Sequence, residues 1–192
     1  RTYALGNYDT LLKAISRDPA MLIWLDSRRN KKSAPNENFA RELMELFSMG
    51  IGHYTEADVR ESARAFTGWG LRKKDFVFQA TQHDFGSKTF LGYTGNFDGD
   101  DIIDIIMEQP ATAEFISGKL FAFFVYDDPE PAILTSLAET FRSNHYSIEA
   151  VVRQILTSPE FYSEKAYRAK IKSPAEMVSG TVRSLGIETS GR

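Results

Sequence analysis

Hydrophobic residues recur every three or four positions along most of the chain, a spacing that predicts a succession of amphipathic helices. The clearest case is the segment 36–50, NENFARELMELFSMG. Gly50 is expected to end this helix, because glycine adopts the left-handed conformation of a helix terminus at little cost. The apolar positions fall on one face and are Phe39, Leu43, Leu46 and Phe47.

A second helix is predicted directly after the first, in the segment 55–68. Thr55 is a favourable N-cap, and Asp58 three residues later completes a capping box. Gly68 would end this helix. Its apolar stripe would consist of Val59, Ala63 and Phe66. We therefore expect a pair of helices joined by a tight glycine-rich turn at the centre of the fold.

Further helices are predicted on both sides of this pair. Pro19 suits a helix start, and Ser173 with Glu176 forms another capping box. Asp100 is the expected cap of a helix over 101–108. The other predicted helical segments are 8–17, 19–26, 111–125, 131–141, 148–156 and 174–185. The segment 19–26 carries an apolar cluster of Ala20, Ile23 and Trp24.

The pattern changes after Trp69, where short β-prone runs replace the helical period. Phe76–Phe78 and Thr89–Leu91 are such runs, and glycines punctuate them. We predict a β-hairpin or an ordered loop at 74–92. No repeat or linker divides the chain, so the expected fold is mainly all-α, as a single multi-helical domain over 1–192.

Composition and charge narrow the class of protein. The chain of 192 residues is 42% hydrophobic and 26% charged, as expected of a folded domain with a sizeable core. A net charge of −3 argues against broad contact with phosphate backbones, so no nucleic-acid partner is expected. The absence of cysteine excludes disulfides, thiolate catalysis and cysteine-ligated metals.

No apolar run approaches the roughly 20 residues that span a bilayer, so no transmembrane segment is expected in this chain. No signal peptide is expected within this fragment either, which says nothing about a longer parent protein. The chain begins at Arg1 rather than methionine, and we therefore expect it to be a part excised from a longer protein.

His83 is the best single candidate for a catalytic or ligand-binding side chain. The adjacent Asp84 could fix its tautomer or raise its pKa, although neighbouring residues of a strand point to opposite faces. His53 lies in the turn of the central pair and would approach Glu42 or Glu45 only if the chain folds back. The alternative is that the histidines are structural.

Glu42 and Glu45 lie three residues apart at the edge of the apolar face of the first helix. Two such carboxylates could hold a metal, or one could carry a raised pKa. The competing interpretation is architectural, in which polar side chains satisfy helix ends and loop carbonyls. The residues assigned to that polar network are Asn36, Asn38, Arg41, Glu42, Thr55, Asp58 and Ser173.

Familiar catalytic signatures are missing from the chain. It contains no nucleophile elbow, phosphate-binding loop, dinucleotide fingerprint or H-E-x-x-H motif. The acidic run that starts at Asn96 fails as an EF-hand, because its sixth position is Asp101 rather than glycine and its twelfth is Met107 rather than glutamate. Metal and cofactor are therefore left unassigned.

Several blocks of the sequence resemble one bacterial family in the same order. They are NENFARELMELFSMG with YTEADVRESARAFTGW, HDFGSKTFLG at 83–92, GNFDGDDIIDII at 95–106, SPEFY at 158–162 and IKSPAEMV at 171–178. Together they resemble the family catalogued as domain of unknown function 1800 over residues 20–187. The resemblance implies a mainly helical, exported bacterial protein of the periplasm or cell envelope. Members are typically much longer, so this chain resembles their C-terminal part.

Two functions follow as hypotheses. The first is a binding domain that contacts a protein or polysaccharide partner in the cell envelope through exposed aromatics near Trp69, Tyr54 and the 74–95 loop. The second is a hydrolase-like, metal-dependent enzyme in which Glu42, Glu45, His83 and Asp84 converge.

The basic segment 27–35, SRRNKKSAP, could dock an acidic partner or be a solvated loop. The candidate binding residues are Tyr54, Trp69, Lys88 and Lys172.

Overall fold

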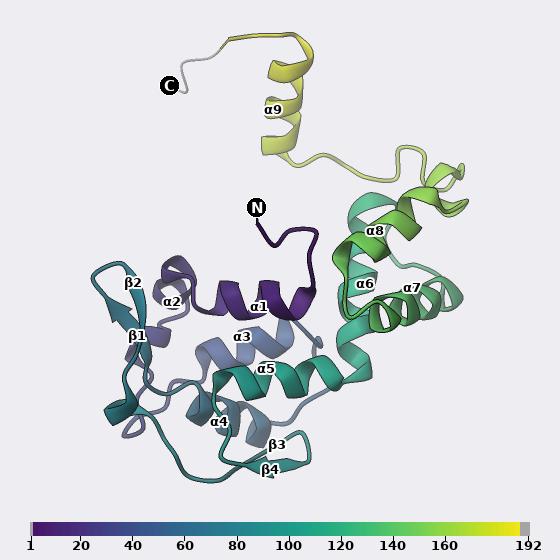
Figure 1. The fold of residues 1–192 in the computed structure, drawn as a ribbon. Helices are drawn as coiled ribbons and strands as arrows, with labels where there is room; N and C mark the ends of the chain where they lie inside the picture. Colours follow the sequence, from purple (N-terminus) through teal and green to yellow (C-terminus); the bar gives the residue numbers. More distant parts are fainter. Residues whose placement is uncertain (1, 189–192) are drawn as a thin grey trace.

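The computed structural model describes residues 2–188 and is mainly helical, with two short β-hairpins, which confirms the predicted fold class (Figure 1). The α-helices in this range are α1 Tyr8–Ser16, α2 Pro19–Trp24, α3 Asn38–Glu45, α4 Glu56–Ala65, α5 Gly99–Glu108, α6 Pro110–Phe124, α7 Pro131–Ser143, α8 Ile148–Thr157 and α9 Pro174–Ser184. Short 3₁₀ turns are η1 Ser27–Arg29, η2 Ala80–Gln82 and η3 Glu160–Tyr162. None of the helices described between residues 2 and 188 has the length and hydropathy of a membrane-spanning segment.

An aromatic chain forms the centre of the first hydrophobic cluster, which α1, α3, α4 and α5 enclose. Phe39 of α3 meets Phe66 edge to face, with ring centroids 4.9 Å apart, and Phe66 meets Trp69 in the same way at 5.0 Å. The guanidinium of Arg17 lies 4.7 Å from the centre of the Trp69 ring. Gly99, at the start of α5, packs directly against Phe66 and Trp69.

A second hydrophobic cluster lies between α6, α7 and α8. Phe121, Phe141 and Val151 are among its fully buried members. Tyr8 and Tyr146 pack against both clusters, and their hydroxyls donate to the backbone carbonyls of Phe47 and Met107. These two tyrosines therefore tie the α6–α8 layer to the helices of the first cluster.

Among the described residues, the strands form two local hairpins in place of the predicted hairpin across 74–92. β1 (Trp69–Arg72) pairs with β2 (Asp75–Phe78), and β3 (Lys88–Phe90) pairs with β4 (Tyr93–Gly95), both antiparallel. Each loop has only two residues, and in the second both Leu91 and Gly92 have positive φ, as tight hairpin turns require. Closing a short loop costs less chain entropy than closing the long one, which explains the pairing.

One predicted helix start and one predicted apolar cluster need correction. Asp98, rather than Asp100, caps α5, because its carboxylate accepts the N–H groups of Asp100 and Asp101 at 2.8 and 3.2 Å. The predicted apolar cluster on α2 is wrong as well. Trp24 is 85% exposed and Ile23 half-exposed, because α2 buries Leu22 and the two residues that follow point to other sides of the helix.

The capping boxes predicted at Thr55–Asp58 and Ser173–Glu176 are present, at the starts of α4 and α9. The carboxylate of Asp58 also accepts the N–H of Leu91 at 2.8 Å, which fixes the second hairpin against α4. α9 stands apart from the other helices in Figure 1 and contains no buried residue.

The approach of α5 to the aromatic chain makes Gly99 sensitive to any side chain. A Cβ at this position would come within 2.4 Å of the Trp69 ring and 2.6 Å of the Phe66 ring. We expect Gly99→Ala to lower the free energy of unfolding by about 1–3 kcal/mol, as overpacking of a core does. Urea unfolding followed by circular dichroism measures the change.

The matched control is Gly118→Ala on α6, where a Cβ would meet only Leu134, at 3.4 Å. Alanine is the better helix former, so this variant should equal or exceed the parent in stability. Equal stability of Gly99→Ala and the parent would contradict the close packing of α5.

Candidate functional site

The polar residues of the central pair mostly make structural contacts. Arg41 on α3 forms a two-pronged ion pair with Glu56 on α4, at 2.7 and 2.8 Å, and also reaches Glu37 at 3.3 Å. The hydrogen bonds from Arg41 hold the pKa of Glu56 below its ordinary value. Tyr54 donates its hydroxyl to Glu45 at 3.3 Å, whereas half-buried Glu42 contacts no other described side chain by hydrogen bond or ion pair.

The asparagines around the start of α3 bind backbone groups. Asn36 accepts the N–H of Asn38 at 3.0 Å, and Asn38 donates to the carbonyl of Leu25 at 3.2 Å. Buried Asn30, which the sequence did not single out, accepts the N–H of Asn36 and donates to the carbonyl of Ala63. These contacts join the segment before α3 to α2 and α4.

His83 is 2% exposed and faces the protein interior. Its Nδ1 donates to the carbonyl of Thr67 at 2.7 Å, which fixes the tautomer with Nε2 unprotonated in the neutral ring. Phe78 and Phe85 lie edge to face with the imidazole at 5.2 and 4.6 Å. The ring is thus held by a backbone carbonyl and two aromatic side chains, and Asp84 is not its partner.

Asp84 points to α4. Arg64 donates its Nε–H to the Asp84 carboxylate at 2.7 Å and a second N–H to Glu61 at 2.7 Å. The guanidinium holds the pKa of Asp84 below its usual range. The backbone N–H of Gly86 donates to the other Asp84 oxygen at 2.8 Å. Both oxygens of this carboxylate are therefore occupied within the fold.

Lys88 is 1% exposed and closes the same loop. Its ammonium donates to the carbonyls of Asp84 and Gly86 at 2.6 and 3.0 Å. Burial lowers the pKa of Lys88. We call residues 83–88 the clasp loop, because its side chains bind α4, Thr67 and its own backbone.

The remaining predicted binding residues do not gather into one surface. Trp69 is 4% exposed, so the expectation that it belongs to a patch of exposed aromatics is wrong. The reason is that Trp69 lies between Phe66 and Phe76 in the core.

Lys172 is exposed beside the start of α9, where Ser173 accepts the N–H of Glu176. No described group of three or more His, Asp and Glu side chains is placed to hold a metal ion.

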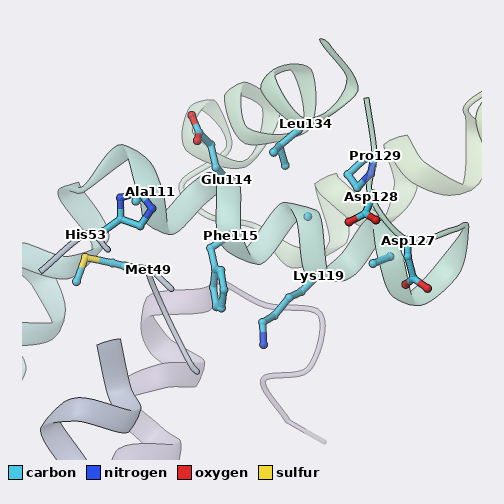
Figure 2. Close-up of a pocket in the computed structure, with 12 residues that line it drawn as sticks. Met49, His53, Ala111, Glu114, Phe115, Lys119, Asp127, Asp128, Pro129 and Leu134 are labelled. Carbon is cyan, nitrogen blue, oxygen red and sulfur yellow. The ribbon is translucent and has the colours of Figure 1, made fainter. Parts of the chain in front are cut away.

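A cleft of about 690 Å³ lies elsewhere, along one face of α6 (Figure 2). His53 stands at one end and Asp127, Asp128 and Pro129 at the other, with Phe115 and Lys119 of α6 between them. The turn between α3 and α4, α6, and the α6–α7 loop form its walls. The lining residues are Met49, His53, Ala111, Glu114, Phe115, Gly118, Lys119, Ala122, Asp127, Asp128, Pro129 and Leu134.

Small side chains hollow out this cleft. Ala111, Gly118 and Ala122 recur on the α6 face at helical spacing, so the face is recessed between larger neighbours. Gly50 has a φ of +78°, and the Phe115 ring would lie 2.8 Å from a Cβ there. Glycine at position 50 therefore lets Phe115 pack over the turn and form part of the floor.

The rim of the cleft is predominantly acidic. Asp127 is paired with Lys170 at 2.5 Å, whereas Glu114 and Asp128 have no cation within 4.0 Å among the described residues. The ammonium of Lys119 lies 4.6 Å from the centre of the Phe115 ring, above the apolar floor. The cleft thus offers an apolar floor and two unpaired carboxylates.

Of the residues that line this cleft, only His53 was a functional candidate from the sequence, and it was considered as a neighbour of Glu42 or Glu45. The available signal was the small residues at positions 111, 118 and 122 of one helical face, next to a charged loop. That signal alone does not distinguish a groove from a helix–helix contact.

The Arg64–Asp84 pair leads to a prediction about pH. The folded-state pKa of Asp84 lies below its unfolded value of about 3.9, so the pair stabilises the fold above that pH and loses its effect as pH falls. We expect Asp84→Asn to cost about 1–2 kcal/mol at pH 7 for a partly solvated pair, and the difference from the parent to shrink below about pH 4. Urea unfolding over a pH series measures both.

Glu149→Gln serves as the control, because Glu149 pairs with Arg153 on the exposed surface of α8. That variant should differ little from the parent at any pH. A pH-independent cost of Asp84→Asn would show that its charge does not stabilise the fold.

Comparison with known proteins gives one result on the family. No curated protein and no solved structure matches the chain. The model of the family described as "Protein of unknown function (DUF1800)" matches residues 1–191, in agreement with the resemblance of the sequence blocks. The chain therefore belongs to this family.

Proposed function

We propose that this chain is a binding domain that takes up an extended protein segment in the α6 cleft. The observation that carries the proposal is the combination of an apolar floor with the unpaired carboxylates of Glu114 and Asp128. Apolar side chains of a partner would be removed from water on the floor, and its lysine or arginine side chains would meet the acidic rim.

The size of the cleft supports a short segment. From Ala111 to Ala122 the α6 face extends about 16 Å, at about 1.5 Å per residue. An extended peptide advances about 3.3 Å per residue, so about five residues would fill the cleft. A globular partner would present such a segment as a terminus or a loop.

The hydrolase alternative has less support. It requires at least two of Glu42, Glu45, His83 and Asp84 to meet in one pocket. Thr67 holds His83, Arg64 holds Asp84, and Tyr54 contacts Glu45. None of these four residues lines the α6 cleft.

We further propose that the domain acts outside the cytoplasm, in the periplasm or cell envelope of a bacterium. Support comes from the resemblance of its sequence blocks alone. Fractionation of cells that express the native protein at its natural level tests this, and recovery in the cytoplasmic fraction would contradict it.

The charge of the rim should determine which peptides bind. We expect pentapeptides with basic and aliphatic residues to bind the purified chain on a peptide array, and acidic counterparts to fail. The double variant Glu114→Gln/Asp128→Asn should weaken binding about tenfold, or roughly 1.4 kcal/mol for two partly exposed charge pairs. Fluorescence anisotropy with labelled peptides from the array measures the affinity.

Asparagine suits position 128, because the φ of Asp128 is +57° and asparagine tolerates that conformation. Glu139→Gln on the exposed face of α7 is the control and should bind as the parent does. Binding of neutral polysaccharides in place of peptides would overturn the proposed ligand class.

Filling the cleft should abolish binding without unfolding the chain. Ala122→Phe places a ring in the recess of α6, and we expect the peptide affinity to fall below detection while the melting temperature changes little. Ala175→Phe on the exposed part of α9 adds the same ring away from the cleft and should leave the affinity unchanged. Undiminished binding by a folded Ala122→Phe variant would place the peptide site elsewhere.

A further inference from the structure

The cationic residues of two segments gather at one end of the molecule. The segments are 27–35, which contains η1, and the turn of the β1–β2 hairpin. Their exposed cations are Arg28, Arg29, Lys31, Lys32, Arg72, Lys73 and Lys74, and we call them the basic end. η1 and α2 both pack against β1, and Figure 1 shows α2 beside the tip of the hairpin.

The basic end is held in place by backbone hydrogen bonds. The carbonyl of Asn30 accepts the N–H of Gly68 at 3.1 Å, and the N–H of Lys32 donates to the carbonyl of Gln82 at 2.8 Å. Gly68 and Gln82 flank the β1–β2 hairpin, so these bonds attach 27–35 to the chain at the open end of the hairpin. The cations of 27–35 therefore belong to a segment bonded to its neighbours and not to a free tail.

The charge of this surface is largely uncompensated. Of the seven cations, only Arg29 has a carboxylate of a described residue within 4.0 Å, namely Asp26 at 3.8 Å. The segments 18–35 and 69–78 together hold three acidic residues against these seven, while the whole chain has a net charge of −3. The rest of the chain is therefore acidic, and the molecule is electrically polarised.

Two exposed apolar side chains come shortly before these cations in the chain. Trp24 at the end of α2 is 85% exposed, and the preceding Ile23 is 50% exposed. Indole rings favour the boundary between lipid headgroups and acyl chains. A strand of nucleic acid or an acidic polysaccharide offers phosphates or carboxylates, but no apolar layer that would cover Ile23.

We propose that the basic end, together with Ile23 and Trp24, docks on an anionic lipid membrane surface. The cations would face headgroup phosphates, and the two apolar side chains would enter the interfacial layer. This inference stands on different residues from the α6 cleft, so either proposal can fail without the other.

Sedimentation with vesicles tests the proposal on the intact chain. We expect binding to phosphatidylcholine vesicles that contain phosphatidylglycerol, weak binding to pure phosphatidylcholine, and loss of binding at high salt. Each cation removed should lower the partition coefficient roughly fivefold, so Arg28→Gln/Arg29→Gln should reduce it about 25-fold. Arg142→Gln/Arg183→Gln removes two exposed arginines elsewhere and should retain most of the binding.

Tryptophan emission provides a second readout. The chain has two tryptophans, and Trp69 is buried, so a blue shift on vesicle binding would report Trp24. The shift should vanish in Trp24→Phe.

The proposal is overturned if no vesicle binds, if both lipid compositions bind equally, or if the control variant loses as much binding as Arg28→Gln/Arg29→Gln. Preferential binding of a DNA duplex over anionic vesicles would overturn it too.

Discussion

The contact of Gly99 with the Phe66–Trp69 pair is the constraint from which the arrangement of the helices follows. It brings the start of α5 onto the end of α4, and α5 then fills the first cluster with isoleucines. Only Gln109 separates α5 from α6, and its side chain donates to the carbonyl of Ile105 at 3.0 Å. The direction of α6, and with it the α6 cleft, is thus set by the position of α5.

The clasp loop illustrates how polar residues with catalytic chemistry can serve the fold. The imidazole of His83, the carboxylate of Asp84 and the amine of Lys88 lie within six residues, yet hydrogen bonds to the fold hold each of them. Burying an ammonium or an imidazole without partners would cost several kcal/mol, so these hydrogen bonds are a condition of burial. Once its partners are fixed in this way, a side chain has little freedom to bind a substrate.

Two surfaces of opposite character distinguish this molecule from a simple helical scaffold. The rim of the α6 cleft carries carboxylates, whereas the basic end carries cations beside an exposed tryptophan. The cations of the basic end repel cationic partners, whereas the carboxylates of the cleft rim repel anionic ones. The two surfaces therefore favour different occupants. In the two proposals, the domain would hold a basic peptide in the cleft while the basic end contacts a lipid surface.

Much of the local structure could be predicted from the sequence, although the hairpins and the cap of α5 could not. Helical periodicity gave the helices, and Thr55 with Asp58 and Ser173 with Glu176 gave two of their starts, because capping depends on residues only three positions apart. Tertiary structure decided which apolar residues are covered: Trp69 became core and Trp24 surface, although both are tryptophans at the end of a predicted helix or just after it. It also decided the partners of His83 and Asp84, and it alone created the cleft, because a cavity depends on distances between segments that periodicity does not encode.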